Sequence, residues 1–184
     1  MMLAIAAFVI PKKAVAPENT VAPESVQRIP TFSLSSPAFE ADAMIPSMYT
    51  CDEKQVSPPL IIANVPAGTK SFAVIMEDPD VPKQLMPSGV FLHWVMFSIP
   101  VTTTEIRAGE SVGVLGTNGA GKASYIGPCP PKEYMPDVHR YVFTLYALDA
   151  MLDLKTGASK DDVVKSMQGH VLGQTELIGK YKKK

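Results

Sequence analysis

Four short segments of the chain carry side chains that could bind an anion or transfer a proton. They are Asp78-Pro79-Asp80, His93-Trp94, the run YIGPCPP from Tyr125 to Pro131, and His139-Arg140-Tyr141. Imidazoles and free backbone N–H groups donate hydrogen bonds to phosphate oxygens, while a carboxylate accepts from an ammonium or hydroxyl group. Proline fixes φ, so the third segment is a rigid loop. If the fold brings the four segments together, they form a small pocket for a phosphorylated or zwitterionic ligand.

Each segment also has an ordinary structural explanation. An aspartate before proline often begins a turn, as Asp78 could, because its carboxylate accepts nearby N–H groups. His93 lies in an apolar run and could be a buried core histidine, and His139 could simply cap a strand. The occurrence of all four segments in this order is far more specific than any one of them, and it favours the pocket. We assign no role to His170.

The same acidic and histidine residues would also suit general acid–base hydrolysis or a metal site. No nucleophile stands out, however, because Ser57 and Ser124 lack a nucleophile elbow and Cys129 lies between two prolines with no sign of activation. We therefore predict a non-enzymatic binding protein without catalytic residues, metal ligands or a cofactor. A hydrolase and a metal-binding protein remain the alternatives.

Residues 116–123 read GTNGAGKA, which nearly matches the nucleotide-binding pattern GxxxxGK[ST]. Ala123 replaces the hydroxyl residue that would hold magnesium. Gly127-Pro128 follow Lys122 too closely for the helix that such a site requires. We expect a structural loop here and not an NTPase site.

Apolar periodicity predicts mainly strands. Runs rich in β-branched and aromatic residues occur at 60–65, 71–76, 90–99 and 140–148, and a half-buried strand is expected at 31–35. Alternation places Phe91, His93, Val95 and Phe97 on one face of their strand, with Trp94 on the other. His139 and Tyr141 share a face of theirs.

A helix is predicted after Ser159. Ser159 and Asp162 can form a capping box, and apolar residues recur at helical spacing. These apolar residues are Val163, Val164, Met167, Val171 and Leu172. The expected fold is therefore an all-β dominated, antiparallel β-sandwich with a C-terminal helix laid across one edge.

Composition favours one folded domain and excludes one class of partner. The chain has 184 residues, 46% of them hydrophobic, which is enough for a single core. Its formal net charge of −1 gives no electrostatic footprint for nucleic acid. The only basic cluster is the tail with Lys180 and residues 182–184, which we interpret as a solvated end.

The N-terminal region predicts export. Residues 1–13 are an apolar segment, too short to span a bilayer, that resembles a truncated secretion signal or a weak anchor. Residues 14–30 repeat the sequence VAPE and form a Pro-rich linker, which leaves 31–184 as the folded domain. We expect an exported or envelope-anchored protein, with a cytoplasmic protein as the alternative.

Cys51 and Cys129 are the two cysteines of the chain. A bridge between them could stabilise an exported fold by about 4 kcal/mol in the chain-entropy model. The sequence leaves open whether they pair or are two buried thiols.

The four segments, in this order, resemble the phosphatidylethanolamine-binding protein family, specifically its bacterial and archaeal branch of Raf-kinase-inhibitor-like proteins. The resemblance runs from about Phe32 to Tyr181. It implies a Greek-key β-sandwich with short peripheral helices and a small pocket for phosphate-like anions and phosphorylethanolamine head groups. The ligand-binding residues that it implies are Asp78, Phe91, His93, Tyr125, Gly127, Pro128, His139 and Tyr141. Asp80 and Trp94 are expected to be structural.

The resemblance also suggests partners. In some relatives it implies regulation of kinases or proteases, so the expected partners are a small anionic or phosphorylated ligand, a phospholipid head group, or a kinase or protease. The oligomeric state stays open. Two stretches, 81–90 and 132–138, depart from the family pattern where they flank the expected pocket mouth, so the ligand can differ from that of other family members.

Overall fold

Strands make up most of the regular structure in residues 31–184, which are the residues that this computed structural model describes. The predicted segments 1–13 and 14–30 lie outside the described residues. The strands are β1 (Ser33–Ser35), β2 (Leu60–Ala63), β3 (Ser71–Asp78), β4 (Phe91–Pro100), β5 (Glu105–Ile106), β6 (Val114–Leu115), β7 (His139–Leu148) and β8 (Val171–Tyr181). One α-helix, α1 (Lys160–Met167), and a short 3₁₀ helix, η1 (Ser47–Tyr49), complete the described part.

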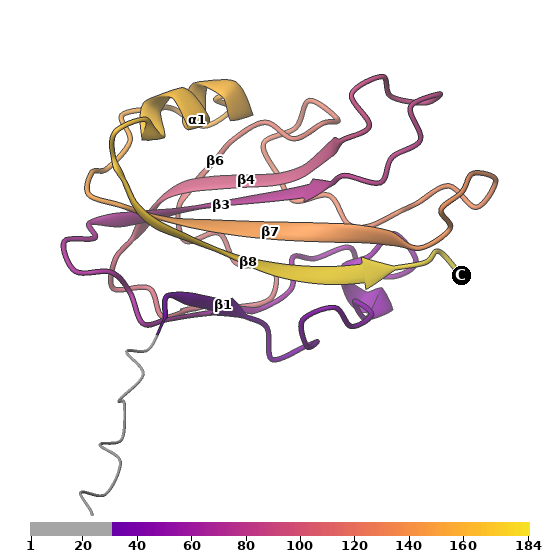
Figure 1. The fold of residues 1–184 in the computed structure, drawn as a ribbon, viewed down its shortest axis with the longest axis horizontal. Coiled ribbons are helices and arrows are strands. Elements are labelled where there is room, and N and C mark those ends of the chain that lie inside the picture. Colours follow the sequence, from indigo (N-terminus) through magenta and orange to yellow (C-terminus); the bar gives the residue numbers. More distant parts are fainter. Residues whose placement is uncertain (1–30) are drawn as a thin grey trace, which may run out of the picture.

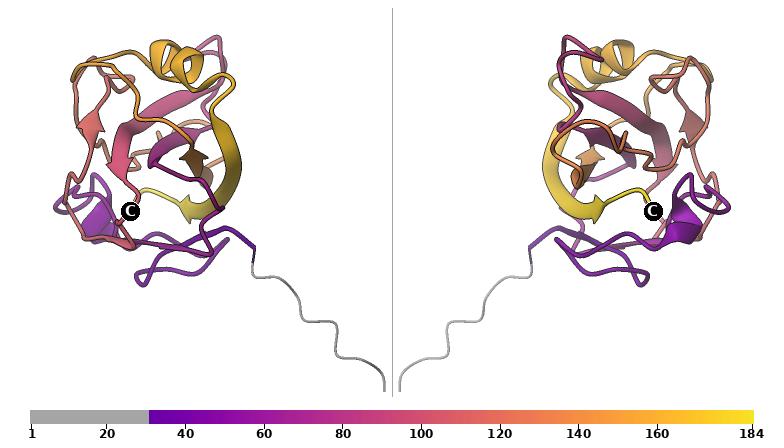
Figure 2. Two further views of the ribbon diagram at one scale, coloured as in Figure 1. Left: turned by 90° about the vertical axis from the view of Figure 1, so that its left-hand side faces the viewer. Right: turned by 90° about the vertical axis from the view of Figure 1, so that its right-hand side faces the viewer.

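The strands form two antiparallel sheets. Strands β1, β2 and β5 make a small sheet in the order β1-β2-β5, and the larger sheet has the order β6-β4-β3-β7-β8. Figure 1 shows β1 on one side of the large sheet and α1 on the other, and Figure 2 shows the same layers end-on. The predicted antiparallel β-sandwich with a helix is confirmed, but the helix packs on a face of the large sheet and not across an edge, and strand β8 follows it.

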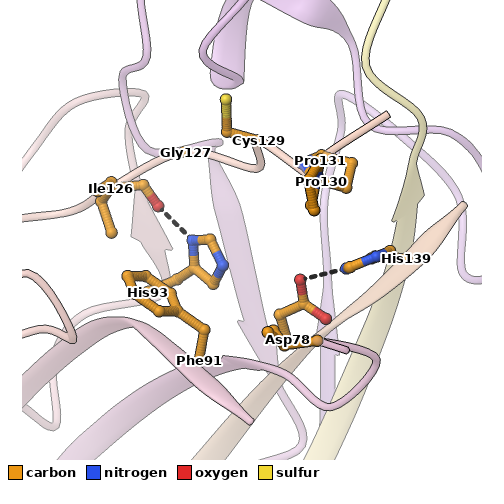
Figure 3. A pocket seen from close by; sticks show the side chains of 10 residues that line it. Asp78, Phe91, His93, Ile126, Gly127, Cys129, Pro130, Pro131 and His139 are labelled. Carbon is orange, nitrogen blue, oxygen red and sulfur yellow. Dashed lines mark hydrogen bonds and ion pairs between the residues drawn. The ribbon is translucent and has the colours of Figure 1, made fainter. Parts of the chain in front are cut away.

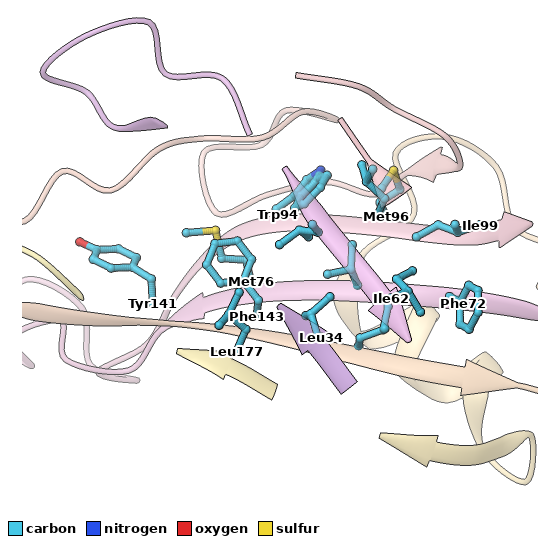
Figure 4. Close-up of a cluster of buried hydrophobic side chains, with 14 of the residues drawn as sticks. Leu34, Ile62, Phe72, Met76, Trp94, Met96, Ile99, Tyr141, Phe143 and Leu177 are labelled. Atoms are coloured by element: carbon cyan, nitrogen blue, oxygen red, sulfur yellow. The ribbon is translucent and has the colours of Figure 1, made fainter. Parts of the chain in front are cut away.

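The large sheet is covered on both faces. Its inner face packs against the small sheet through the main core, whose members include Leu34, Ile62, Phe72, Met76, Trp94, Tyr141, Phe143 and Leu177 (Figure 4). Its outer face packs against α1 and the segment before it through a second core of Ala73, Ile75, Val95, Phe97, Leu148, Leu152, Val163 and Met167. This double burial explains why β3 and β4 are apolar almost throughout.

Helix α1 is shorter than the sequence pattern predicts. It begins at the expected capping box of Ser159 and Asp162, but it ends at Met167, and Gly169 follows with a φ of +81°. Val171 and Leu172, predicted to continue the helix, instead open strand β8 and are exposed. A left-handed glycine ends the helix, and the chain then pairs with the free edge of β7 along its full length.

A β-bulge interrupts β4 at His93. Met76 of β3 pairs with Trp94, while the next residue, Glu77, pairs with Leu92, so His93 is the extra residue in β4. A bulge of this kind locally changes the direction in which the strand's side chains point.

The bulge overturns the predicted distribution of side chains in β4. His93 was expected to share a face with Val95 and Phe97, but those two residues belong to the second core. The His93 ring instead lies between Phe91 and Tyr141, with centroid distances of 4.9 and 5.1 Å. Strict alternation failed because the extra residue shifts the phase of the strand.

The segment that resembles a nucleotide-binding loop has a structural role, as expected. The Asn118 side chain accepts hydrogen bonds from the N–H groups of Ala120 and Lys122 and donates to the Ser124 carbonyl. No helix follows it before β7. Within residues 31–184, no helix is long and apolar enough to cross a membrane.

Candidate functional site

The ends of β3, β4 and β7 meet at one end of the large sheet, on the right in Figure 1. Asp78 ends β3, His93 lies near the start of β4, and His139 begins β7. Together with the loop at 126–131 they enclose a cavity of about 180 Å³ (Figure 3). Its lining residues are Asp78, Val81, Phe91, His93, Ile126, Gly127, Cys129, Pro130, Pro131 and His139.

Asp78 and His139 form a buried pair in the cavity wall. His139 Nδ1 lies 2.7 Å from Asp78 Oδ2, and their side chains are 1% and 5% exposed. The second carboxylate oxygen, Oδ1, accepts the N–H of Asp80 at 2.9 Å. His139 Nε2 is buried and has no hydrogen-bond partner within residues 31–184. His139 Nε2 is therefore free to bind a ligand.

His93 faces this pair across the cavity (Figure 3). Its Nδ1 lies 2.7 Å from the carbonyl oxygen of Ile126. A carbonyl can only accept, so Nδ1 carries the proton, and in the neutral ring Nε2 is an acceptor. Burial lowers the pKa of His93, against the opposing effects of the Ile126 carbonyl and the Asp78 charge. Neutral His93 therefore predominates at neutral pH.

Tyr141 lies behind the histidines. It does not line the cavity, but its ring packs edge-on against His93 and is fully buried. Its hydroxyl has no hydrogen-bond partner within residues 31–184. Burial first, and then the negative charge of the nearby Asp78, raises the pKa of Tyr141. Its hydroxyl thus remains a protonated donor in this polar cluster.

The loop at 126–131 fits closely against the segment after η1. A Cβ atom on Gly127 would lie 2.7 Å from the Tyr49 carbonyl oxygen and 3.0 Å from Thr50 Cα, so only glycine fits without moving backbone. The Gly127 N–H donates to Gln55 Oε1 at 3.2 Å. This close fit explains the need for glycine at this point of the loop.

A disulfide fixes the same loop. Cys51 and Cys129 are bonded, and the Cys51 N–H donates to the Pro128 carbonyl at 3.1 Å. Cys129 is exposed and forms part of the cavity lining. The sequence left open whether the two cysteines pair or are buried thiols, and the described structure has the disulfide. This covalent link lies at the cavity rim.

Asp80 lies outside the cavity lining and braces the turn, as its predicted structural role requires. Its carboxylate accepts two hydrogen bonds from the Arg140 guanidinium, at 2.7 and 2.9 Å, and a third from the Arg140 N–H at 2.9 Å. The hydrogen bonds from the Arg140 side chain hold the pKa of Asp80 below its usual value. This pair ties the end of β3 to the start of β7.

Besides Tyr141, two more residues predicted to bind ligand do not line the cavity. Tyr125 is turned away from the cavity, because its ring packs edge-on against Trp94 at 5.7 Å and its hydroxyl donates to the Tyr49 carbonyl at 2.8 Å. Burial raises its pKa. Pro128 belongs to the loop but is buried and does not line the cavity. Trp94 lies in the main core, in keeping with a structural role.

The cavity brings together Asp78, Phe91, His93, Gly127 and His139 from the predicted ligand-binding residues. Sequence reasoning did not assign Val81, Ile126, Pro130 or Pro131 to it, nor Cys129 as a lining residue. Pro130 and Pro131 stand in the quoted loop and could have been included. Ile126 acts through its backbone carbonyl, for which the sequence has no signal.

Residues 31–184 contain no cluster of three or more His, Cys, Asp or Glu side chains arranged to hold a metal ion. The cavity instead combines apolar walls with a few polar atoms, namely two imidazoles and one carboxylate. Such a combination is typical of a site for a small organic or phosphorylated ligand.

Comparisons with known proteins agree with this architecture. A family model for phosphatidylethanolamine-binding proteins matches residues 35–182. A UPF0098 protein of Methanothermobacter thermautotrophicus is 47% identical over 160 residues, covering 82% of this chain and 99% of the relative. A UPF0098 protein of Chlamydia pneumoniae is 42% identical over 151 residues, covering 82% of this chain and 98% of the relative.

Two crystal structures are also similar. A putative phosphatidylethanolamine-binding protein homologue from Chlamydia trachomatis has a TM-score of 0.79 and 36% identity, covering 83% of this chain and 98% of its own. E. coli YbcL, described as a new member of the mammalian PEBP family, has a TM-score of 0.73 and 27% identity, covering 83% of this chain and 99% of its own.

Proposed function

Because the chain belongs to the phosphatidylethanolamine-binding protein family and is a binding module of that type, we propose that its cavity binds a small phosphoryl anion without turning it over. Inorganic phosphate and phosphorylethanolamine-like head groups are the expected class. The observation that carries this proposal is that two imidazole nitrogens with unused bonding capacity, His93 Nε2 and His139 Nε2, meet in one small, largely apolar cavity.

The loop at the rim supplies a further donor. Of residues 128–131 only Cys129 has a backbone N–H, because the other three are prolines. No hydrogen bond uses this N–H within the described part of the chain. A backbone donor in a rigid loop costs little to hold in place, so it is well suited to a phosphoryl oxygen.

Lysines lie beside the same rim. A second hollow, which shares Pro130 with the cavity, is lined by Lys132, Lys182 and Lys183 together with Asp137. Asp137 pairs with Lys182. The tail was expected to be only a solvated end, but its position next to the cavity supports attraction of anions to the mouth.

A hydrolase is the second candidate, and the Asp78–His139 pair favours it. An imidazole oriented by a carboxylate, with its second nitrogen unpartnered, has the arrangement of a general base. The cavity lining contains no serine or threonine, and Cys129 is bonded to Cys51. Hydrolysis would therefore require a water nucleophile, so binding without turnover remains the better-supported function.

Isothermal titration calorimetry with phosphate and phosphorylethanolamine tests the proposal. We expect saturable binding to the wild type, lost in His93→Ala and retained in Asp149→Asn, a change at the opposite end of β7. The same protein incubated with p-nitrophenyl phosphate should release no nitrophenolate above the His93→Ala background. Absence of binding by the folded wild type would refute the function, and turnover that disappears in His93→Ala would establish the hydrolase.

An export or envelope location, and a kinase or protease as partner, remain predictions from the sequence.

A further inference from the structure

We propose that the cavity binds its phosphoryl anion in a form that still carries a proton, and so discriminates phosphate and its monoesters from sulfate. This inference rests on the proposed function and concerns which anion the same site accepts. It follows from the chemistry of the cavity lining, which includes two hydrogen-bond acceptors, the Asp78 carboxylate and His93 Nε2.

The first acceptor is the Asp78 carboxylate. It lines the cavity, its side chain is 5% exposed, and each of its oxygens already accepts one hydrogen bond, from the Asp80 N–H and from His139 Nδ1. An ionised carboxylate oxygen can accept again but cannot donate. An anion without a proton would meet lone pairs here and would also be repelled by the charge.

The second acceptor is His93 Nε2. Because Nδ1 donates to the Ile126 carbonyl at 2.7 Å, the neutral ring presents an unprotonated Nε2 toward the cavity. Burial lowers the pKa of His93 and favours this neutral state. Both Asp78 and His93 therefore favour a ligand atom that donates.

The other titratable groups around the site do not cancel this preference. His139 faces His93 and is occupied at Nδ1 by Asp78, and Tyr141 lies outside the lining, whereas the Cys129 N–H at the rim is an unused donor. Asp80 is neutralised by Arg140 outside the lining. The site thus offers a backbone donor for one phosphoryl oxygen and acceptors for a P–OH group.

Phosphate and its monoesters can satisfy both kinds of partner. The second pKa of a phosphate monoester lies near 6, so most of it carries one proton at pH 5.5. Inorganic phosphate is a weaker acid in this step and keeps the proton to higher pH. Sulfate has no proton at these pH values, and a phosphodiester has a single charge but no P–OH group. An unsatisfied acceptor in a buried site should weaken binding by about tenfold or more.

Calorimetry of the full chain at constant ionic strength tests this with four probes: phosphate, methyl phosphate, dimethyl phosphate and sulfate, at pH 5.5, 6.5 and 7.5. We expect phosphate and methyl phosphate to bind at least about tenfold more tightly than sulfate at pH 5.5. Their advantage should shrink as pH rises to 7.5. Dimethyl phosphate, which has the charge of the monoanion but no proton, should bind as weakly as sulfate.

The Asp78→Asn variant locates the effect. Its amide can donate, so the phosphate-to-sulfate ratio should fall to about threefold or less, whereas Asp149→Asn should keep the wild-type ratio. The ligand series on the wild type does not depend on this variant being folded. If the wild type binds phosphate and sulfate equally well, the inference is overturned but the anion-binding function stands. If it binds neither, both are overturned. A ratio unchanged in folded Asp78→Asn would overturn the assignment to Asp78.

Discussion

Two histidine–aspartate pairs with the same geometry lie at opposite ends of β7. At one end His139 Nδ1 lies 2.7 Å from Asp78, and at the other His170 Nδ1 lies 2.7 Å from Asp149. The side chains of the first pair are 1% and 5% exposed, and those of the second are 47% and 44% exposed. The distance alone therefore says nothing about which pair belongs to a functional site.

The surroundings of the two pairs differ, and this difference shows which pair belongs to a functional site. The exposed pair only links the chain on either side of the β7–β8 connection, where the Asp149 N–H also donates to the His170 carbonyl. The buried pair lies beside a cavity, and its imidazole keeps an unpartnered Nε2. Water screens an exposed pair and replaces its partners easily, whereas a buried polar atom without a partner is costly unless a ligand completes it.

The largest expected effect comes from the covalent link that closes the buried end. The disulfide spans a sequence separation of 78 residues, so the Cys51→Ala/Cys129→Ala double variant should lose about 4 kcal/mol of unfolding free energy. Urea denaturation monitored by Trp94 fluorescence measures it, and reduced wild-type protein is the matched comparison. A loss below about 1 kcal/mol in both samples would show that the link does not restrict the unfolded chain as this estimate assumes.

The two pairs themselves should differ sharply in stability. Asp78→Ala leaves a buried imidazole without its partner and should cost about 3 kcal/mol of unfolding free energy. Asp149→Ala, in the exposed pair, should cost about 0.5 kcal/mol or less. Parallel urea titrations of the two variants compare them directly, and similar losses would contradict the importance of burial.

Two glycines extend the comparison to the loops beside each pair. Gly127→Ala places Cβ against the Tyr49 carbonyl and should cost about 2 kcal/mol while also weakening anion binding. Gly169→Ala meets no atom within 4 Å but must hold a φ of +81°, so it should cost about 1 kcal/mol and leave binding unchanged. Thermal unfolding and calorimetry on both variants check this. If Gly127→Ala binds the anion as tightly as the wild type does, the loop does not contribute to the binding site.

The same contrast shows what the sequence could predict. The order of the four motifs was enough to identify the family, which the family model over residues 35–182 confirms, and to predict that Asp78, His93 and His139 lie at one site. The capping box at Ser159 was also sufficient to locate the start of α1. These features depend on residue type and local spacing, which a sequence records directly.

Other features depend on tertiary structure. The bulge at His93 was invisible because both faces of β4 are apolar, so no change of pattern marks the extra residue. Val171 and Leu172 fit helical spacing, and only the free edge of β7 explains why they form a strand. Tyr125 adjoins the cavity loop in sequence, but its ring packs against Trp94 of the main core and not into the cavity.

The smallest expected effect is a pH dependence that separates His93 from His170. Burial lowers the pKa of His93 in the folded state below its unfolded value of about 6.5. Between these two values the unfolded chain binds a proton that the folded chain does not, so stability is full above pH 6.5 and falls as pH decreases. For one proton the slope is at most about 1.4 kcal/mol per pH unit.

Urea unfolding of the wild type and of His93→Gln from pH 7.5 to 5 measures this slope. The variant cannot take up that proton, so it should lose less stability than the wild type over the interval. His170→Gln is the matched control, because it removes the exposed imidazole and should retain the His93 contribution. Identical slopes for the wild type and His93→Gln would mean that the cavity holds His93 in an environment as polar as water, and the distinction between the two ends of β7 would then rest on geometry alone.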